Sequence, residues 1–173
     1  MKKISSLFII LIVVCSNGLS AAGQKNTLSV MRLKGRVKSV REECFKAVVI
    51  SGQVTKGVKE RPDEKAESDF HSFFNEKGNE TFTIGYRSDG NILSKKFSTY
   101  DDKGNRIEEA EYKANGVTEY KSTSVYDKND NEIENYSYGT DGGLYSKSVS
   151  TYNSRGNRIE AFSYDRYGRL WSK

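Results

Sequence analysis

The chain has 173 residues, with 28 basic and 23 acidic side chains, and its mean hydropathy is −0.72. The charges are interspersed along the chain, so the composition argues against the clustered basic surface that nucleic-acid binding requires. Only 35% of the residues are hydrophobic, which is too few for a thick core. Even so, 11 Tyr and 8 Phe argue against a disordered chain and favour a thin, folded one.

Residues 1–22 predict a secretory signal peptide. Lys2 and Lys3 precede the short apolar run "LFIILIVV", and small residues lead to a cleavage site after Ala21 or Ala22. The apolar run is shorter than the roughly 20 residues that cross a bilayer. We therefore expect a mature chain without a transmembrane span, which is secreted, periplasmic or on the cell surface.

Two cysteines bear on the compartment. Acylation of Cys15 would anchor the protein to a lipid surface. Val14 disfavours this alternative, because lipoprotein signals have a small residue just before the cysteine. Once the signal peptide is removed, Cys44 is the sole cysteine, and an intramolecular disulfide is excluded.

Residues 23–67 differ from the rest of the chain. Alternation of valines with charged residues from Leu28 onwards predicts one long strand or a pair of strands. The polar segment "SGQVTKGVKERPDEKAES" follows and predicts a hairpin. Because the end units of repeat arrays usually differ from the internal units, we expect this region to cap the array that follows.

Residues 68–173 repeat with a period of 26, which gives about four units. Each unit contains two strands and two turns. An Asn recurs in register at Asn79, Asn105, Asn131 and Asn157. The turns are expected to be closed by glycines, namely Gly78, Gly90, Gly104, Gly116, Gly142, Gly156 and Gly168.

The chemistry of the turns follows from their first and last residues. Asp or Asn opens the turn, because its side chain accepts a hydrogen bond from the backbone two residues on. Glycine closes it, because that position of a type I turn with a G1 bulge needs a positive φ. Asp130 replaces glycine in one copy and tolerates the left-handed region. Tyr167 departs from the pattern of the second turn, so we expect the last hairpin to be the least regular.

Between the turns, side chains alternate with period two, as in "NRIEAFSY". Here Ile159 and Ala161 point to one face, and Phe162 and Tyr164 to the other. Strands joined by tight turns run antiparallel. The sequence therefore predicts an all-β fold, an antiparallel meander of repeated hairpins in one twisted, curled layer, with a closed barrel as the alternative.

The run "YDDKGNRIE", with its echoes at Tyr126 and Tyr152, resembles the YD repeats of bacterial RHS-type proteins. Together with the "LKGRVKSV" opening strand, the arrangement resembles small secreted bacterial proteins with YD-like repeats, over about Leu33 to Lys173. This resemblance implies a β-rich extracytoplasmic scaffold or binding surface. It does not carry over the shell or the toxin delivery of large RHS proteins.

No motif indicates an enzyme, a cofactor or a metal site. His71 is the single histidine, so we do not expect a His-based metal cluster or a Ser-His-Asp triad as usually built, and we interpret His71 as an ordinary strand residue. The segment "DKNDNE" from Asp127 resembles the start of a calcium loop, but Glu132 stands where that loop needs glycine. Paired carboxylates such as Glu108 and Glu109 follow the repeat, whereas a catalytic pair should interrupt it.

Tyrosines that recur every 26 residues are the feature with functional potential. On successive repeats they lie two strand spacings apart, about 10 Å. The candidate binding surface consists of Tyr86, Tyr112, Tyr138, Tyr164 and Trp171. We expect a non-enzymatic scaffold of the bacterial cell envelope with a protein partner. The alternative is a module that binds carbohydrate or peptidoglycan, and open sheet edges also allow edge-to-edge self-association.

Overall fold

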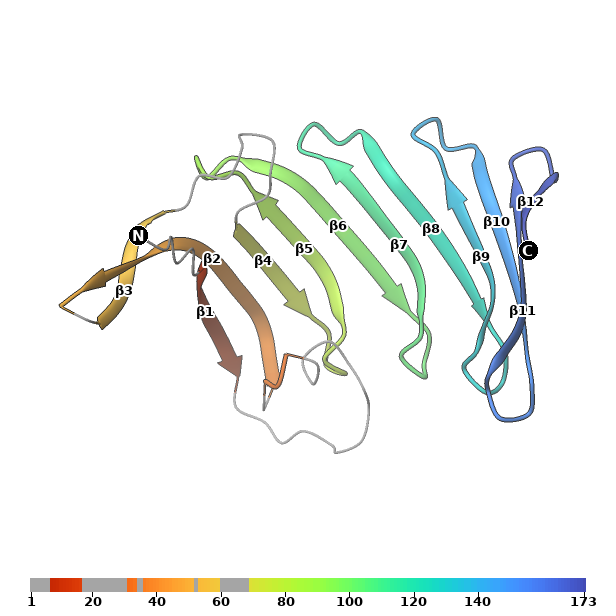
Figure 1. Cartoon of the computed structure of the whole chain (residues 1–173), viewed down its shortest axis with the longest axis horizontal. Helices are drawn as coiled ribbons and strands as arrows, with labels where there is room; N and C mark the ends of the chain where they lie inside the picture. The colour runs from red at the N-terminus through yellow and green to blue at the C-terminus, as the bar shows by residue number, and fades with distance from the viewer. Residues whose placement is uncertain (1–6, 17–30, 34–35, 52, 60–68) are drawn as a thin grey trace. The chain divides into compact units, whose positions relative to one another are not determined.

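A computed structural model describes residues 7–16, 31–33, 36–51, 53–59 and 69–173. Within these ranges the chain forms strands and no helix (Figure 1). The predicted cleavage site at Ala21 or Ala22 and most of the polar segment before residue 69 lie outside them. The strands are β1 (Leu7–Ser16), β2 (Arg36–Ile50), β3 (Gln53–Lys59), β4 (Asp69–Phe74), β5 (Glu80–Tyr86), β6 (Ile92–Tyr100), β7 (Arg106–Lys113), β8 (Thr118–Tyr126), β9 (Glu132–Tyr138), β10 (Leu144–Tyr152), β11 (Arg158–Asp165) and β12 (Leu170–Ser172).

Ten of these strands, β2 and β4 to β12, form an antiparallel meander. The strand order has two ends and does not close on itself. The predicted all-β meander of hairpins is therefore confirmed, and the closed-barrel alternative is wrong. A barrel needs its first and last strands to pair with each other, and the strands at the two ends of this order, β1 and β12, do not pair. Residues 1–95 and 96–173 form two compact units, which are described separately.

In unit 1, β2 is paired along both of its edges. Strand β1 pairs antiparallel with β2 on one edge, from Leu7 opposite Lys46 to Ser16 opposite Arg36. Strands β4 and β3 pair with β2 on the other edge. The hairpin of β2 and β3 turns at Ser51, where the polar segment begins. Most of the segment for which the sequence predicts a hairpin lies outside the described residues, so this prediction stays a prediction.

A small apolar core lies on one side of β2. Val37 and Val40 are buried together with Phe74, and Met31 and Leu33 pack against them. Val37 and Val40 are three residues apart, which would place them on opposite faces of a regular strand. A β-bulge between them, opposite Val14 and Cys15, brings both valines to the same face.

Unit 2 is a single layer of hairpins with almost no buried core. The strands from β7 to β12 pack mainly against their neighbours in the chain. Across residues 96–173, all of which the structure describes, the buried residues are Ser98, Ala110 and Ser122. The expected single layer is therefore confirmed for this unit, and its stability depends mainly on the backbone ladder and the turns.

The turns of the array share one hydrogen-bond pattern. In the turn that opens at Asp101, the N–H of Asp101 donates to the C=O of Asn105 over 2.9 Å, and the N–H of Gly104 donates to the C=O of Asp101 over 3.1 Å. This is the predicted type I turn with a G1 bulge. The closing glycines have positive φ angles, as the sequence predicts: Gly78, Gly90, Gly104, Gly116, Gly142, Gly156 and Gly168.

Two turns depart from the repeat in sequence. Asp130 adopts φ 65°, which confirms that Asp takes the left-handed position. Its carboxylate also accepts hydrogen bonds from Lys103 Nζ (2.9 Å) and Asn105 Nδ2 (3.0 Å) of the neighbouring repeat. The last turn, which contains Tyr167, closes with the same backbone bonds as the others. Asp165 opens this turn in the manner of the first turn of each repeat. The flanking strands β11 and β12 pair at two positions with a register shift between them, so the prediction about the last hairpin stays a prediction.

In each first turn of the repeat, the side chain of the opening Asp or Asn accepts hydrogen bonds from the backbone two and four residues on. We call this arrangement the turn lock, and Asp165 makes the same backbone bonds in the last turn. Asp127 Oδ1 accepts from the N–H of Asn129 (2.8 Å) and the N–H of Asn131 (3.0 Å), and its Oδ2 accepts from Asn131 Nδ2 (2.9 Å). Asp101 and Asn105 make the same set of bonds. The bonds from the Asn131 side chain and backbone lower the pKa of Asp127.

The turn lock predicts that the protein loses stability in acid. A carboxyl group with a lowered pKa stabilises the fold above its ordinary pKa, and this contribution disappears as the pH falls through the lowered value. Asp127 and Asp165 both have a lowered pKa, in each case chiefly through hydrogen bonds from the Asn or Arg four residues on. We expect the thermal midpoint to drop steadily below about pH 4, measured by circular dichroism.

Asn75 and Asn153 provide a natural control, because an amide opens these turns and makes the same backbone bonds without titrating. The double variant Asp127→Asn, Asp165→Asn should therefore remain folded and show a shallower fall in midpoint. An equally steep fall in this variant would contradict the assignment of the acid sensitivity to the turn locks.

Candidate binding surface

The register of unit 2 sorts its side chains onto two faces. Residues that lie opposite each other on paired strands point to the same side of a sheet. Lys121 lies opposite Ala110 and Tyr138, and Lys147 lies opposite Tyr136 and Tyr164. We define the tyrosine face by Tyr112, Tyr138, Tyr164, Lys121, Lys147, Glu108 and Glu134. The opposite serine face carries Ser122, Ser124, Ser137, Ser148 and Ser163, with Ile133 and Ile159 near its rim.

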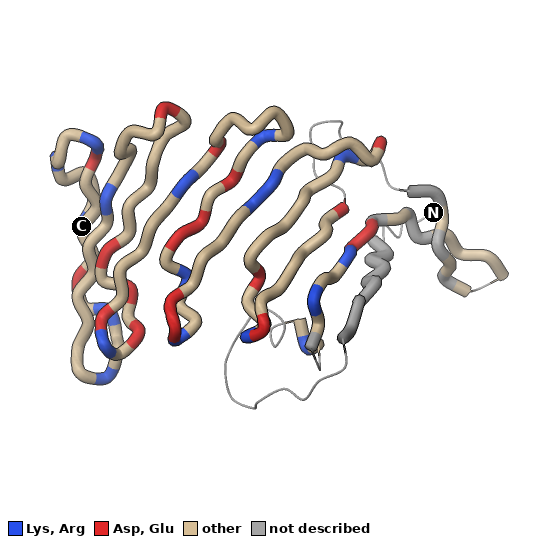
Figure 2. Tube along the Cα trace, turned by 180° about the vertical axis from the view of Figure 1, so that it is seen from behind, with Lys and Arg blue, Asp and Glu red and all other residues tan. Residues whose placement is uncertain are grey.

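Lysine and glutamate pair across neighbouring strands of the tyrosine face. Lys121 Nζ lies 3.0 Å from a Glu108 carboxylate oxygen, and Lys147 Nζ lies 2.9 Å from one of Glu134. The hydrogen bonds to these carboxylates raise the pKa of both lysines. Basic and acidic positions are interspersed along the strands of unit 2 (Figure 2). Because the ion pairs are internal, the tyrosine face suits a neutral partner better than a polyanion.

The Lys147 ion pair also holds an aromatic ring. Tyr136 donates a hydrogen bond from its hydroxyl to Glu134 Oε2 over 2.6 Å, and Lys147 Nζ lies 4.9 Å from the centre of the Tyr136 ring. The bond from Tyr136, followed by the bond from Lys147, lowers the pKa of Glu134. One ammonium therefore fixes a carboxylate and a ring together, and the face is pre-arranged.

Three of the five predicted surface residues lie on the tyrosine face, and all three are half-buried. Tyr112 packs edge-to-face against Phe97, with 5.8 Å between ring centres. The Tyr138 hydroxyl lies 3.5 Å from Thr123 Oγ1. Tyr164 lies directly opposite Lys147. Half-buried rings therefore stand where the sequence interpretation expects open aromatic platforms.

The other two predicted residues are placed differently. Tyr86 belongs to unit 1, where the Arg41 guanidinium lies 6.0 Å from the centre of its ring. Trp171 lies on β12 and is 67% exposed. The structure also exposes aromatic residues that the sequence analysis did not select, and the most exposed of them are Tyr145 (58%) and Tyr167 (74%). Tyr167 departs from the repeat, and this departure is the sequence signal that identifies it.

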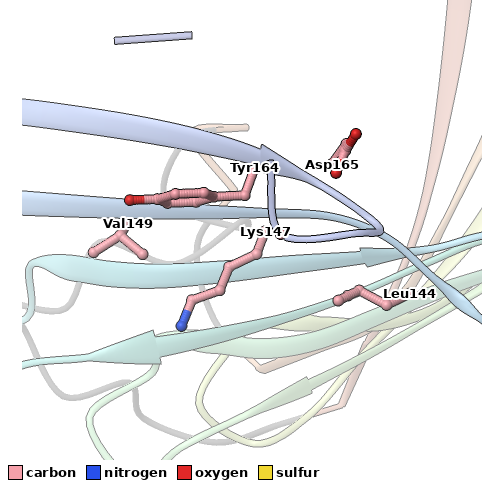
Figure 3. Close-up of a pocket in the computed structure, with 6 residues that line it drawn as sticks. Leu144, Lys147, Val149, Tyr164 and Asp165 are labelled. Atoms are coloured by element: carbon pink, nitrogen blue, oxygen red, sulfur yellow. The ribbon is translucent and has the colours of Figure 1, made fainter. Parts of the chain in front are cut away.

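A shallow hollow lies at the C-terminal side of the tyrosine face. Its volume is about 330 Å³, and it is lined by Leu144, Lys147, Val149, Tyr164, Asp165 and Gly168. Figure 3 shows the Tyr164 ring beside Val149, with the Lys147 side chain extending from the neighbouring strand and Leu144 at the other end. An aromatic face, aliphatic walls and one ammonium form a surface that suits the apolar face of a sugar ring.

The tyrosines of the YD motif itself have a structural role that the sequence analysis missed. The Tyr126 hydroxyl donates to the C=O of Arg106 over 3.1 Å, and the Tyr152 hydroxyl donates to the C=O of Glu132 over 2.9 Å. Each bond spans 20 residues and joins the end of one strand to the start of the strand before it. The recurrence of this Tyr just before the turn Asp or Asn is the signal in the sequence.

His71 lies in a strand of unit 1 among aromatic residues. Its ring centre is 4.3 Å from that of Phe73, and burial, with a smaller effect of Arg41, lowers its pKa. In the part of the chain that the structure describes, no three His, Cys, Asp or Glu side chains gather closely enough to hold a metal ion. The same part contains no helix that is long and apolar enough to span a membrane.

No family model matches the chain, and no curated protein is similar enough to match. Among solved structures, the chain is similar to the crystal structure of TcdB2-TccC3-TEV, with 13% identity over 79% of this chain and a TM-score of 0.33. It is also similar to a Tc holotoxin pore of Photorhabdus luminescens (12% identity over 79%, TM-score 0.25) and to TcdB2-TccC3 (11% over 92%, TM-score 0.24). The matches cover 8%, 10% and 12% of those chains, so the similarity is distant and concerns segments of much longer proteins.

The hydroxyl bonds of the YD tyrosines predict a measurable contribution to stability. Tyr152→Phe removes the bond to the Glu132 C=O and leaves the ring in place, so we expect a loss of about 1 kcal/mol in the free energy of unfolding. Urea denaturation followed by circular dichroism measures it. Tyr145→Phe is the matched control, because Tyr145 lies on the same strand and is exposed. Equal effects of the two changes would contradict this role for Tyr152.

Proposed function

We propose that the protein is a non-enzymatic scaffold of the bacterial cell envelope, which binds another extracytoplasmic protein through the tyrosine face of unit 2. The observation that carries this proposal is the repeated arrangement on this face. The pairs Glu108–Lys121 and Glu134–Lys147 recur after 26 residues, each beside tyrosines. A catalytic site needs one unique cluster, whereas an extended docking surface benefits from a repeated one.

Internal pairing of charge supports a protein partner. Lys121 and Lys147 have their carboxylates on the same face, so a partner that covers them does not leave a lone buried charge. Tyrosine is enriched in protein interfaces, since its ring buries apolar area while its hydroxyl keeps a hydrogen bond. The half-buried tyrosines are also held by their neighbours, which lowers the entropy lost on binding.

Two exposed positions allow a matched crosslinking experiment. Val125 lies on the tyrosine face opposite Glu134 and is 44% exposed, whereas Tyr120 lies on the serine face opposite Glu111 and is 38% exposed. With a photoreactive amino acid at either position in the native envelope, we expect one reproducible protein adduct from position 125 and none from position 120. Equal adducts from both faces, or none from position 125, would contradict the proposal.

Truncation of two tyrosines of the tyrosine face tests whether the adduct at position 125 depends on their rings. In the variant Tyr138→Ala, Tyr164→Ala we expect the yield from position 125 to fall tenfold or more, because truncated interface tyrosines commonly cost over 1.4 kcal/mol of binding free energy. Circular dichroism shows whether this variant is folded. A folded variant with an unchanged yield would remove the tyrosines from the interface.

A second function, binding of neutral envelope glycan or peptidoglycan, is favoured by the hollow around Tyr164. Its walls offer an aromatic ring, the aliphatic Leu144 and Val149, and the Lys147 ammonium. We expect saturable binding of peptidoglycan fragments or a neutral polysaccharide, followed by Trp171 and tyrosine emission, and a loss of about tenfold in affinity in Tyr164→Ala. Tyr120→Ala is the control on the opposite face. A flat titration, or equal losses in both variants, would eliminate this function.

A further inference from the structure

Strand β1 occupies an edge of the sheet that the processed chain would leave open. It consists of Leu7–Ser16, and these residues lie within the predicted signal peptide. Its ladder with β2 covers ten residues of β1, in an antiparallel register with one bulge (Figure 1). Removal of residues 1–22 would expose the backbone N–H and C=O groups of β2 along this edge. An unpaired edge of that length favours pairing with another strand.

The other described strands that pair with β2 do not cover this edge. Phe45 pairs with Phe8 on the β1 side and with Lys59 of β3 on the other side, so β3 lies on the opposite edge. Strand β4 pairs with β2 at Ser39 to Glu42, also away from β1. Met31 and Leu33 already pack on the apolar core over Val37 and Val40. Met31 and Leu33 therefore lie over a face of the sheet.

The charges along β2 complement those of a second β2 strand. Basic Lys38 and Arg41 precede acidic Glu42 and Glu43. In an antiparallel pair related by a two-fold axis at Val40, Lys38 of each strand lies beside Glu42 of the other, and Arg41 lies opposite Ser39. Lys38 is exposed, and Glu42 is half-buried. Opposite charges on facing strands stabilise such pairs, whereas like charges destabilise them.

We propose that the processed protein is a homodimer, in which the β2 edge freed of β1 pairs antiparallel with the β2 edge of a second copy. In the unprocessed chain β1 occupies the edge and keeps the protein monomeric until the signal peptide is removed. A two-fold interface of this kind is closed, since each copy uses the same edge. The inference depends on the predicted cleavage and not on the function of the tyrosine face.

The test uses the full chain exported and processed by the cell, with the new N-terminus established by intact mass. Sedimentation equilibrium should give twice the monomer mass for the processed protein, and the monomer mass for the full chain that retains residues 1–22. Lys38→Glu should convert the processed protein to a monomer, because it sets like charges against each other. The double variant Lys38→Glu, Glu42→Lys should restore the dimer.

The charge swap separates loss of pairing from loss of folding, since the double variant carries both changes and regains the dimer. A processed protein that is monomeric, with its β2 amides protected from hydrogen exchange by residues 23–35 of the same chain, would overturn the proposal. So would a dimer that is unaffected by Lys38→Glu, or a chain that is exported without cleavage. Glycan or partner binding by the tyrosine face tests the proposed function separately and does not bear on these outcomes.

Discussion

The turn lock is the interaction on which the array depends. Unit 2 buries only Ser98, Ala110 and Ser122, so apolar packing supplies little of the stability that a domain of this size needs. A single layer of hairpins is held instead by its backbone ladder, and the ladder is only as regular as its turns. The Asp127 carboxylate that bridges Asn129 and Asn131 fixes the turn residue by residue, and this fixes the register of both flanking strands.

The register of the strands in turn determines which side chains lie together on the tyrosine face. Because each turn is the same, every strand places its Tyr, Lys or Glu at the same height, and the Lys–Glu pairs of the tyrosine face recur with the repeat. The hydroxyls of Tyr126 and Tyr152 tie neighbouring strands together at their ends and reinforce this alignment. A slip of one residue in one turn would move a row of tyrosines to the serine face. Stability and the proposed binding surface therefore depend on the same few bonds.

Local features of the fold could be predicted from the sequence, and features that depend on pairing could not. The 26-residue period, the positive φ angles of the turn glycines and the left-handed Asp130 all follow from chemistry within a few residues. The side-chain role of Asn131 and the hydroxyl bond of Tyr152 to Glu132 depend on which atoms the turn and the register bring together. The last turn closes regularly because Asp165 locks it, although Tyr167 departs from the repeat.

The face on which the candidate surface lies is a local feature and could be predicted, whereas the exposure of its rings depends on strand pairing and could not. Alternation correctly placed Tyr112, Tyr138 and Tyr164 on one face, but the exposure of a ring depends on its neighbours across the strands. Lys121 and Lys147 lie beside these tyrosines and leave them half-buried, whereas Tyr145 and Tyr167 are open. Local alternation determines the face, and the cross-strand partners determine how much of each ring a ligand reaches.

The most direct test of this account compares the free energy of unfolding of two truncations in the same repeat, measured by urea denaturation. Asp127→Ala removes the acceptor of the turn lock, and Ile133→Ala removes a half-buried apolar side chain from the next strand. If turns and ladder hold unit 2, Asp127→Ala is the more destabilising change. A larger loss from Ile133→Ala would contradict the account and show that apolar packing holds the array.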